Sequence, residues 1–171
     1  MPFKIPVVSI VASASDYGKT RLITGIVSAL ADLKISACVI KHASHNEDPD
    51  LEKDTWKYRE AGAIASAMLN SKGLATYYVP KSSLEDAIEI LSCQGVAIIL
   101  CEGFKDSSIP KLVIVDGPED FRLLASLSNV KAAVARGPTK PPTKVPVIEY
   151  DAKEVTKFIQ SSFLCHRDGH G

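Results

Sequence analysis

Residues 13–20, Ser-Ala-Ser-Asp-Tyr-Gly-Lys-Thr, constrain the fold of this chain more than any other segment. They match the phosphate-binding pattern G-x-x-x-x-G-K-[ST] except at the first glycine, and that pattern joins a buried strand to a helix. Here the apolar run 7–12 leads into the loop, and an amphipathic segment, 19–33, leads out of it. Backbone N–H groups of such a loop converge on phosphate oxygens at the positive end of the helix. The three parts together predict a nucleotide-binding α/β protein.

The residues of this loop have distinct expected roles. Lys19 would reach the terminal phosphates, and the hydroxyl of Thr20 would be a ligand of Mg²⁺. Ser13 replaces a glycine, a residue that adopts backbone conformations that serine seldom does. The alternative is a chance Gly-Lys-Thr at the start of a helix. On the first interpretation, the residues around the nucleotide are Ser15, Asp16, Tyr17, Gly18, Lys19, Thr20 and Arg21.

A carboxylate at the end of a second strand completes the expected phosphate site. The unbroken apolar segment 96–101 is followed by Glu102. In phosphate-loop proteins an acid in this place assists Mg²⁺ or the attacking water. Mg²⁺ needs only Thr20, one carboxylate and two phosphate oxygens from such a site, because it keeps several waters. Glu102 and Lys19 are therefore the candidate catalytic residues.

The segment 41–50, which follows the second predicted strand, is very polar. Open α/β sheets bind ligands at the carboxyl ends of their strands, so Lys41 and His42 would face phosphate or substrate. Asp48 or Asp50 would hold Mg²⁺ directly or through water. The alternative is a solvated acidic loop, which loops commonly are.

The alternation of apolar and amphipathic segments predicts an α/β fold. Helices are expected over 19–33, from Asp54 towards Gly62, from a capping box formed by Ser82 and Glu85, and from Asp151. Several strands are unbroken apolar runs, which is typical of a largely parallel sheet covered by helices on both faces. The expected strands are 6–12, 36–40, 65–69, 75–79, 96–101, 111–115, 130–135 and 145–148.

One stretch departs from this alternation. Residues 104–124 contain Pro110, Gly117 and Pro118 around a short strand, which predicts a β excursion from the main sheet. No linker divides the chain, so we expect one phosphate-loop domain over 1–164. The last seven residues, 165–171, would form a disordered tail.

Charge and composition narrow the possible partners. The 171 residues carry 20 basic and 20 acidic side chains, and a net charge of zero argues against a nucleic-acid or anionic-membrane surface. No apolar stretch approaches the roughly 20 residues that cross a bilayer. The four cysteines lack a C-x-x-C spacing, which favours a reducing, cytoplasmic setting. The Thr-Lys pairs at 139–140 and 143–144 lack the aspartate that reads guanine in many GTPases, so the residues alone leave guanine and adenine open.

In order and spacing, these motifs resemble the MobB family, molybdopterin-guanine dinucleotide biosynthesis protein B. The resemblance runs from about 7 to 163. It comprises the phosphate loop, the strand end 39–42, the acidic loop, the segments 53–56 and 59–63, the Glu102-Gly103-Phe104-Lys105 run, residues 109–111 and the closing strand and helix.

The resemblance implies a GTP-binding accessory protein of molybdenum cofactor synthesis with weak GTPase activity. It implies that Lys19, Thr20 and Glu102 bind phosphates and Mg²⁺, with Asp48, Asp50 and Asp54 lining the same cleft. The implied partner is the MobA-like guanylyltransferase that joins GMP to molybdopterin. The resemblance also implies a homodimer, in which strands outside the main sheet pair between the two subunits. Residues 104–124 are the element expected to form this pairing. A phosphotransferase for a small molecule and a non-catalytic nucleotide-binding module are the alternatives.

Overall fold

The protein, seen in a computed structural model, forms two compact units. One comprises Met1–His42 and Ile88–Gly171, and the other comprises Ala43–Ala87. The structure describes residues 4–14, 17–43, 50–79, 82–138 and 141–164. The predicted site residues Ser15, Asp16 and Asp48 and the predicted tail, 165–171, lie outside the described residues.

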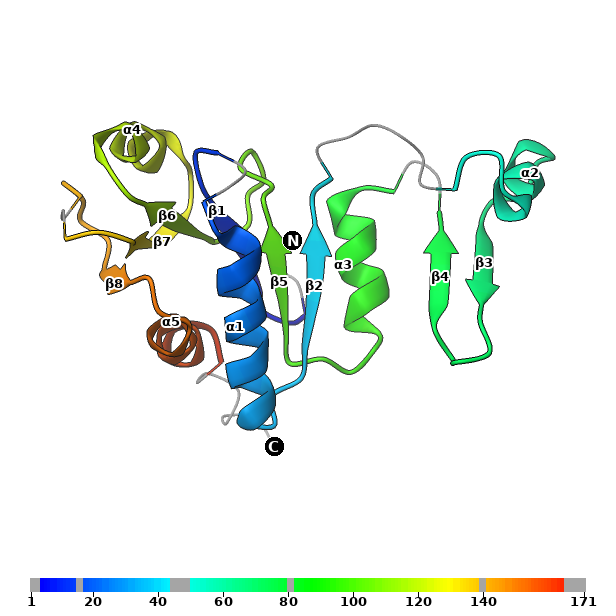
Figure 1. Cartoon of the computed structure of the whole chain (residues 1–171), viewed down its shortest axis with the longest axis horizontal. Helices are drawn as coiled ribbons and strands as arrows, with labels where there is room; N and C mark the ends of the chain where they lie inside the picture. The colour runs from blue at the N-terminus through cyan, green and yellow to red at the C-terminus, as the bar shows by residue number, and fades with distance from the viewer. Residues whose placement is uncertain (1–3, 15–16, 44–49, 80–81, 139–140, 165–171) are drawn as a thin grey trace. The chain divides into compact units, whose positions relative to one another are not determined.

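The first unit is built on a six-stranded parallel sheet with the strand order β2-β5-β1-β6-β7-β8 (Figure 1). Every residue of β5, β1 and β6 is buried, as unbroken apolar runs predict. The prediction of a largely parallel sheet is confirmed. The strands are β1 (Val7–Val11), β2 (Ala37–Lys41), β5 (Ile98–Glu102), β6 (Lys111–Val115), β7 (Val130–Ala135) and β8 (Val147–Glu149).

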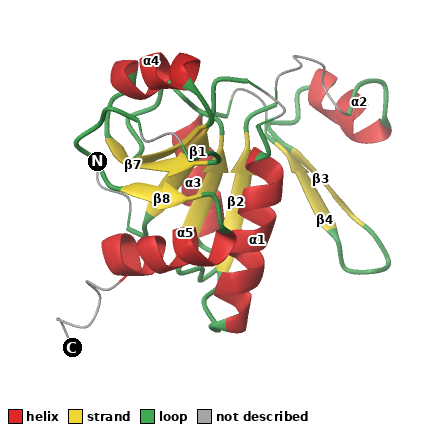
Figure 2. Cartoon of the chain, turned by 60° about the vertical axis from the view of Figure 1, so that its left-hand side comes forward, coloured by secondary structure: helices red, strands yellow, loops and turns green. Residues whose placement is uncertain are grey.

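Helices cover both faces of this sheet (Figure 2). Helices α1 (Lys19–Asp32) and α5 (Ala152–Ile159) pack against the side chains that β1 directs to one face. Helix α4 (Pro118–Ser126) packs against the other face. The alternation of side chains along β1 supplies both cores, because successive residues of a strand point to opposite faces. No helix in the described ranges has the length and apolar character needed to cross a bilayer.

The predicted excursion over 104–124 is wrong. Lys111–Val115 is the central strand β6, which pairs in parallel with β1 and β7. Gly117 and Pro118, interpreted as part of that excursion, instead begin helix α4, with Gly117 as the N-cap and proline in the first turn. Proline suits the first turn of a helix because its missing N–H would have no intrahelical partner there.

Two described strands lie outside the parallel sheet, and both belong to the second unit. There β3 (Ser66–Leu69) and β4 (Ala75–Tyr78) form an antiparallel hairpin after helix α2 (Asp54–Glu60). The side chain of Asn70 accepts hydrogen bonds from the backbone N–H groups of Lys72 and Leu74 in the connecting turn. Both strands were expected from their apolar runs, but their antiparallel pairing was not.

Helix α3 (Leu84–Ser92) contains the boundary between the units, which falls before Ile88. Its capping box lies one residue later than predicted. Ser83 and Asp86 exchange hydrogen bonds between side chain and backbone, while the hydroxyl of Ser82 donates to the carbonyl of Val79. Each serine has an acid three residues on, so the pattern offers two capping boxes, and the structure forms the second.

Candidate nucleotide-binding site

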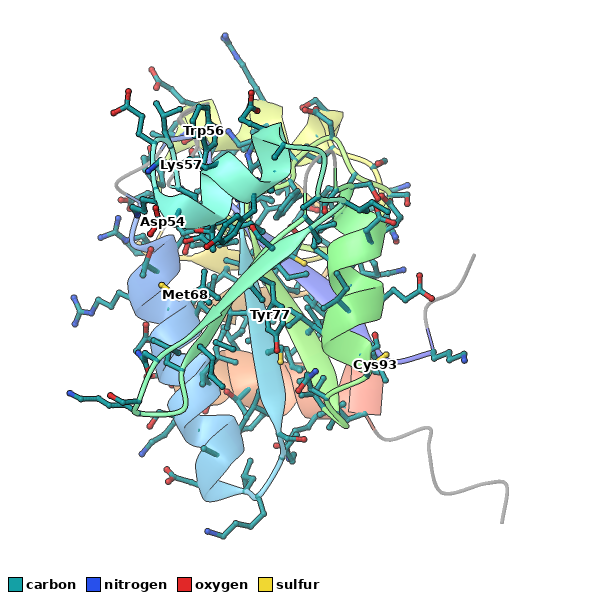
Figure 3. The ribbon with its side chains drawn as sticks, turned by 90° about the vertical axis from the view of Figure 1, so that its right-hand side faces the viewer. Asp54, Trp56, Lys57, Met68, Tyr77 and Cys93 are labelled. Atoms are coloured by element: carbon teal, nitrogen blue, oxygen red, sulfur yellow. The ribbon has the colours of Figure 1, made fainter. Side chains whose placement is uncertain are left out.

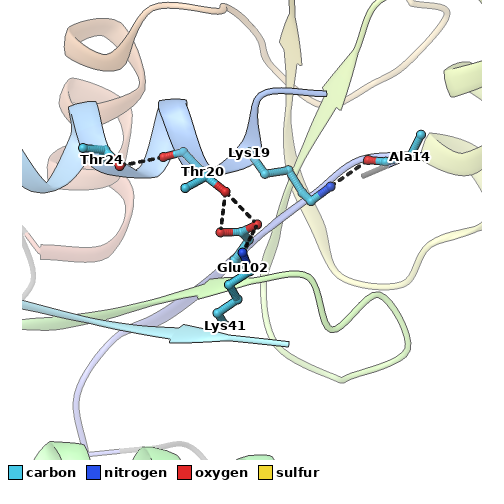
Figure 4. A network of polar contacts seen from close by, with 6 residues as sticks. All are labelled: Ala14, Lys19, Thr20, Thr24, Lys41 and Glu102. Carbon is cyan, nitrogen blue, oxygen red and sulfur yellow. Dashed lines mark hydrogen bonds and ion pairs between the residues drawn. The ribbon is translucent and has the colours of Figure 1, made fainter. Parts of the chain in front are cut away.

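The phosphate-loop sequence lies between β1 and α1, as predicted. Gly18 is the N-cap of α1 and has a φ of 74°, a left-handed conformation that glycine adopts at little cost. The ammonium group of Lys19 donates to the carbonyl of Ala14 at 2.7 Å, across the loop (Figure 4). Tyr17 is half-buried against the core, whereas Arg21 is exposed. The loop thus presents a lysine at the N-terminus of a helix.

Thr20 and Glu102 meet beside this loop (Figure 4). The Thr20 hydroxyl lies 3.0 Å from both Oε1 and Oε2 of Glu102. The parallel register of β1 and β5 places Ile10 opposite Glu102, so the carboxylate lies near the carboxyl end of β1, where the loop begins. The Glu102 side chain is only 11% exposed. Two motifs far apart in the sequence therefore form one polar pair.

This pair has the donor chemistry that Mg²⁺ requires. A hydroxyl carries one proton, so sharing it between two carboxylate oxygens leaves Glu102 with unused acceptor capacity. Mg²⁺ binds hydroxyl and carboxylate oxygens and takes most other ligands from waters and substrate phosphates. The residues present at Thr20 and Glu102 fit such an ion.

Two further lysines contact this site, one at Glu102 and one at the phosphate loop. Lys41 ends β2, and the register of β2 and β5 places it opposite Glu102, with Nζ 3.9 Å from Oε1. Its side chain is 65% exposed, so the charge is available to a ligand. The Nζ of Lys105 donates to the carbonyl of Ser13 at 3.0 Å. With Lys19, these groups make this edge of the sheet positive and suited to phosphate.

The turn after β5 brings His42 close to the site. Gly103 has a φ of 93°, and a Cβ there would lie 3.1 Å from the Cβ of His42. The His42 ring packs on the Phe104 ring with centroids 5.0 Å apart. The Ser9 hydroxyl, inside β1, donates to the Gly103 carbonyl. The turn is therefore held from both sides, and its position fixes Glu102.

Sequence reasoning missed Ser9 as part of the site and did not predict the contact of Lys105 with the phosphate loop. A serine within the otherwise apolar run 7–12 was the available signal for the first. For Lys105, the signal was its place in the run that begins at Glu102. In the structure both make contacts to backbone carbonyls that shape the loop and the turn.

Asp50, a predicted Mg²⁺ ligand, lies in the second unit and is buried. Its Oδ1 accepts from the Thr55 hydroxyl at 2.7 Å, and its Oδ2 pairs with Arg59 at 2.6 Å. Burial raises the pKa of this carboxyl, but the hydrogen bonds from Thr55 and Arg59 and the charge of Arg59 outweigh burial and lower the pKa below its usual value. Both oxygens thus have partners within the unit.

The other acid that the resemblance placed in the cleft, Asp54, pairs with Lys57 at 3.2 Å on the surface of the same unit. Across the described ranges, no three His, Cys, Asp or Glu side chains gather into a group that could hold a metal ion. Within the described part of the first unit, the Thr20–Glu102 pair is the candidate for holding Mg²⁺.

A parallel sheet, a Gly-Lys-Thr helix start and an acid at the end of the neighbouring strand define a P-loop nucleotide-binding protein. Residues 7–136 match the family model described as MobB, molybdopterin guanine dinucleotide synthesis protein B. The chain therefore belongs to the MobB family.

Named relatives agree with this assignment. The chain is 33% identical, over 65% of its length, to the molybdopterin-guanine dinucleotide biosynthesis adapter protein of Haemophilus influenzae, and spans 64% of that protein. It is 29% identical to the probable adapter protein of Bacillus subtilis, covering 77% of this chain and 76% of that one. A solved MobB homologue from Bacillus stearothermophilus is 25% identical, with a TM-score of 0.69, over 91% of this chain and 95% of that one.

Proposed function

We propose that this protein binds GTP and Mg²⁺ at the P-loop and acts as an adapter in the synthesis of molybdopterin guanine dinucleotide. One observation carries the nucleotide assignment. Thr20, which directly follows Gly18 and Lys19, contacts both carboxylate oxygens of Glu102 through its hydroxyl. The relatives are molybdopterin-guanine dinucleotide biosynthesis adapter proteins, which supports the pathway and the base.

Different groups of the site would bind the phosphates and the metal ion of a bound triphosphate. Backbone N–H groups at the start of α1 would donate to phosphate oxygens, and the helix dipole would add to the attraction. Lys19 would exchange its bond to the Ala14 carbonyl for the terminal phosphates. Thr20 and Glu102 would hold Mg²⁺, which neutralises charge on the triphosphate when it is bound. We expect hydrolysis to be slow.

The neighbouring positive groups suit a second, anionic ligand. Lys41 ends β2, His42 follows it directly, and Lys105 lies three residues after the end of β5. Their place at the carboxyl ends of parallel strands is where open α/β sheets bind substrates. Charge-assisted hydrogen bonds from this group would hold the phosphate of molybdopterin beside GTP. The MobA-like guanylyltransferase would then act on both.

We also propose a homodimer, formed by the β3–β4 hairpin rather than by the stretch 104–124. The hairpin register pairs Ala67 with Tyr77 and Leu69 with Ala75, which puts these side chains on one face. Leu69 is 72% and Tyr77 is 70% exposed (Figure 3 labels Tyr77). The other face carries Ser66 and Tyr78, which contact Arg59. An exposed apolar sheet face of this kind commonly marks an interface.

The cysteines support a cytoplasmic location. Cys38, Cys93 and Cys101 of the described chain are free thiols. Thiols persist in reducing compartments, whereas secreted proteins usually pair them.

The decisive test of the proposed function is a reconstituted assay. Purified protein, its cognate guanylyltransferase, molybdopterin and Mg-GTP are mixed at limiting GTP, and dinucleotide formation is followed. We expect the parent to raise the yield and Lys19→Ala to raise it much less. Phosphate transfer from GTP to another small molecule would instead support a phosphotransferase. Nucleotide binding with neither stimulation of the transferase nor contact with it would support a non-catalytic module.

A further inference from the structure

Tyr150, which follows the edge strand β8, links this edge of the sheet to the phosphate loop. Its hydroxyl donates to the Gly18 carbonyl at 2.8 Å, across 132 positions of sequence. That carbonyl also accepts the first helical hydrogen bond, from the N–H of Leu22 at 2.9 Å. A Cβ added at Gly18 would collide with the Tyr150 hydroxyl. Glycine at this position therefore permits both the backbone conformation and the approach of the tyrosine.

This hydrogen bond also fixes the direction of a backbone N–H group. A peptide unit is planar and trans, so holding the Gly18 carbonyl also holds the N–H of Lys19 in the opposite direction. Lys19 is the first residue of α1, and its N–H belongs to the set that has no acceptor within the helix. These are the groups that a helix offers to phosphate. Tyr150 therefore acts on the orientation of a phosphate-binding amide.

Tyr150 is itself held by the ends of two other strands. The Arg136 guanidinium lies over its ring, 5.3 Å from the centroid, and pairs with Asp116 at 3.7 Å. Asp116, Arg136 and Tyr150 are the residues that directly follow β6, β7 and β8. The Tyr150 N–H also donates to the Ala135 carbonyl at 2.8 Å. A backbone hydrogen bond and a cation on the ring therefore both hold Tyr150 in place.

We infer that Tyr150 is a positioning residue of the phosphate loop, and that Arg136 acts through it. The inference rests on the proposed nucleotide site and adds a device that sets the affinity of that site. The inference also assigns a role to β6, β7 and β8. The residues that follow these strands would stabilise the phosphate loop in its binding conformation before a nucleotide binds. Preorganisation of this kind raises affinity because less ordering remains to be done on binding.

Tyr150→Phe tests the inference, because it removes the hydroxyl and keeps the ring on which Arg136 stacks. We expect the affinities for Mg-GTP and for inorganic tripolyphosphate to fall together by about fivefold, the effect of one hydrogen bond. The loss should be equal for both because the loop contacts phosphate and not the base. Tyr58→Phe, at a tyrosine that is 61% exposed, is the matched control and should bind like the parent.

A second readout reports on the loop without any ligand. Amide exchange of Lys19 and Leu22 should be faster in Tyr150→Phe, while exchange within β5 stays as in the parent. Arg136→Gln should weaken binding in the parent but add nothing to Tyr150→Phe, with Arg122→Gln, at an exposed arginine, as its control.

The outcomes separate this inference from the proposed function. If the parent binds both ligands, and Tyr150→Phe binds them equally well with unchanged exchange at Lys19, the inference is overturned and the nucleotide site stands. If Arg136→Gln weakens the Phe variant as much as the parent, Arg136 does not act through Tyr150. If the parent binds neither ligand, the proposed function fails, and the inference fails with it.

Discussion

The hydroxyl of Thr20 lies 3.0 Å from each carboxylate oxygen of Glu102, although 82 positions separate the two residues in the sequence. The parallel pairing of β1 with β5 creates this contact, because it brings the ends of both strands to one edge of the sheet. The pair joins the phosphate loop to the proposed metal site. The first prediction concerns its charge.

Glu102→Gln should leave the fold intact, since the amide oxygen can still accept the Thr20 hydrogen bond. The loss of charge should weaken the binding of Mg²⁺ together with GTP by tenfold or more, because bonds to charged groups contribute about 1.5–3 kcal/mol. Any Mg²⁺-dependent hydrolysis should fall as well. Calorimetry at varied Mg²⁺ measures the effect. Glu154→Gln, the same change at a surface helix pair with Lys157, is the control. Equal Mg²⁺ dependence in both variants would remove Glu102 from the metal site.

Asp50 should stabilise the second unit in a pH-dependent way. The pKa of its carboxyl is lowered in the folded protein by Thr55 and Arg59 against the effect of burial. The unfolded chain therefore binds the proton more readily, so the stabilisation is complete above about pH 3.8, its ordinary value, and is lost as pH falls through the lower folded value.

Amide exchange in β3 and β4 measures this stabilisation. Protection should fall in acid for the parent, and should be low at every pH for Asp50→Asn, whose amide cannot form the ion pair with Arg59. Lys57→Ala, which breaks only the exposed pair with Asp54, should change little. Protection in Asp50→Asn that matches the parent at pH 7 would contradict this role.

The cysteines should differ sharply in reactivity. Cys101 lies within β5 with no exposed surface, and burial raises the pKa of its thiol to about 12. The thiolate is the reactive form, so iodoacetamide at pH 8 should leave Cys101 unmodified in the native protein. Cys93, at the exposed end of α3, should react readily (Figure 3). Mass spectrometry of the two peptides gives the ratio. Comparable modification of both thiols before denaturation would place Cys101 outside the core.

The exposed face of the hairpin should hold the homodimer together. Replacing Leu69 and Tyr77 by serine removes its two largest exposed apolar side chains and should convert a dimer to a monomer at micromolar concentration. Light scattering gives the mass. Leu33→Ser, at a leucine that is 51% exposed after α1, is the control and should stay dimeric. A monomeric parent would contradict the proposal directly.

Much of this architecture follows from the sequence because burial leaves a clear pattern. The eight strands of the described ranges lie where apolar runs predict them, and Asp151 caps helix α5 as expected. Helix α4 was not predicted, because Gly117 and Pro118 are compatible with both a turn and the start of a helix. The acids Glu119 and Asp120 after the proline favour the helix, and they were the signal that could have found it.

The contacts that complete the site could not be predicted in the same way. The bond from Tyr150 to Gly18 and the bond from Lys105 to Ser13 join segments 132 and 92 positions apart. Each depends on strand order and register, which local patterns do not specify. The sequence could therefore name the phosphate loop and Glu102, but not the side chains that hold the loop in place.

The central claim is that this P-loop binds a nucleotide, and calorimetric titration with Mg-GTP tests it most directly. The parent should bind. Lys19→Ala should bind at least tenfold more weakly, because a charged contact with phosphate is lost. Lys153→Ala, at an exposed lysine of α5, should behave like the parent. A parent that shows no binding of GTP, or a Lys19→Ala variant with unchanged affinity, would contradict the account.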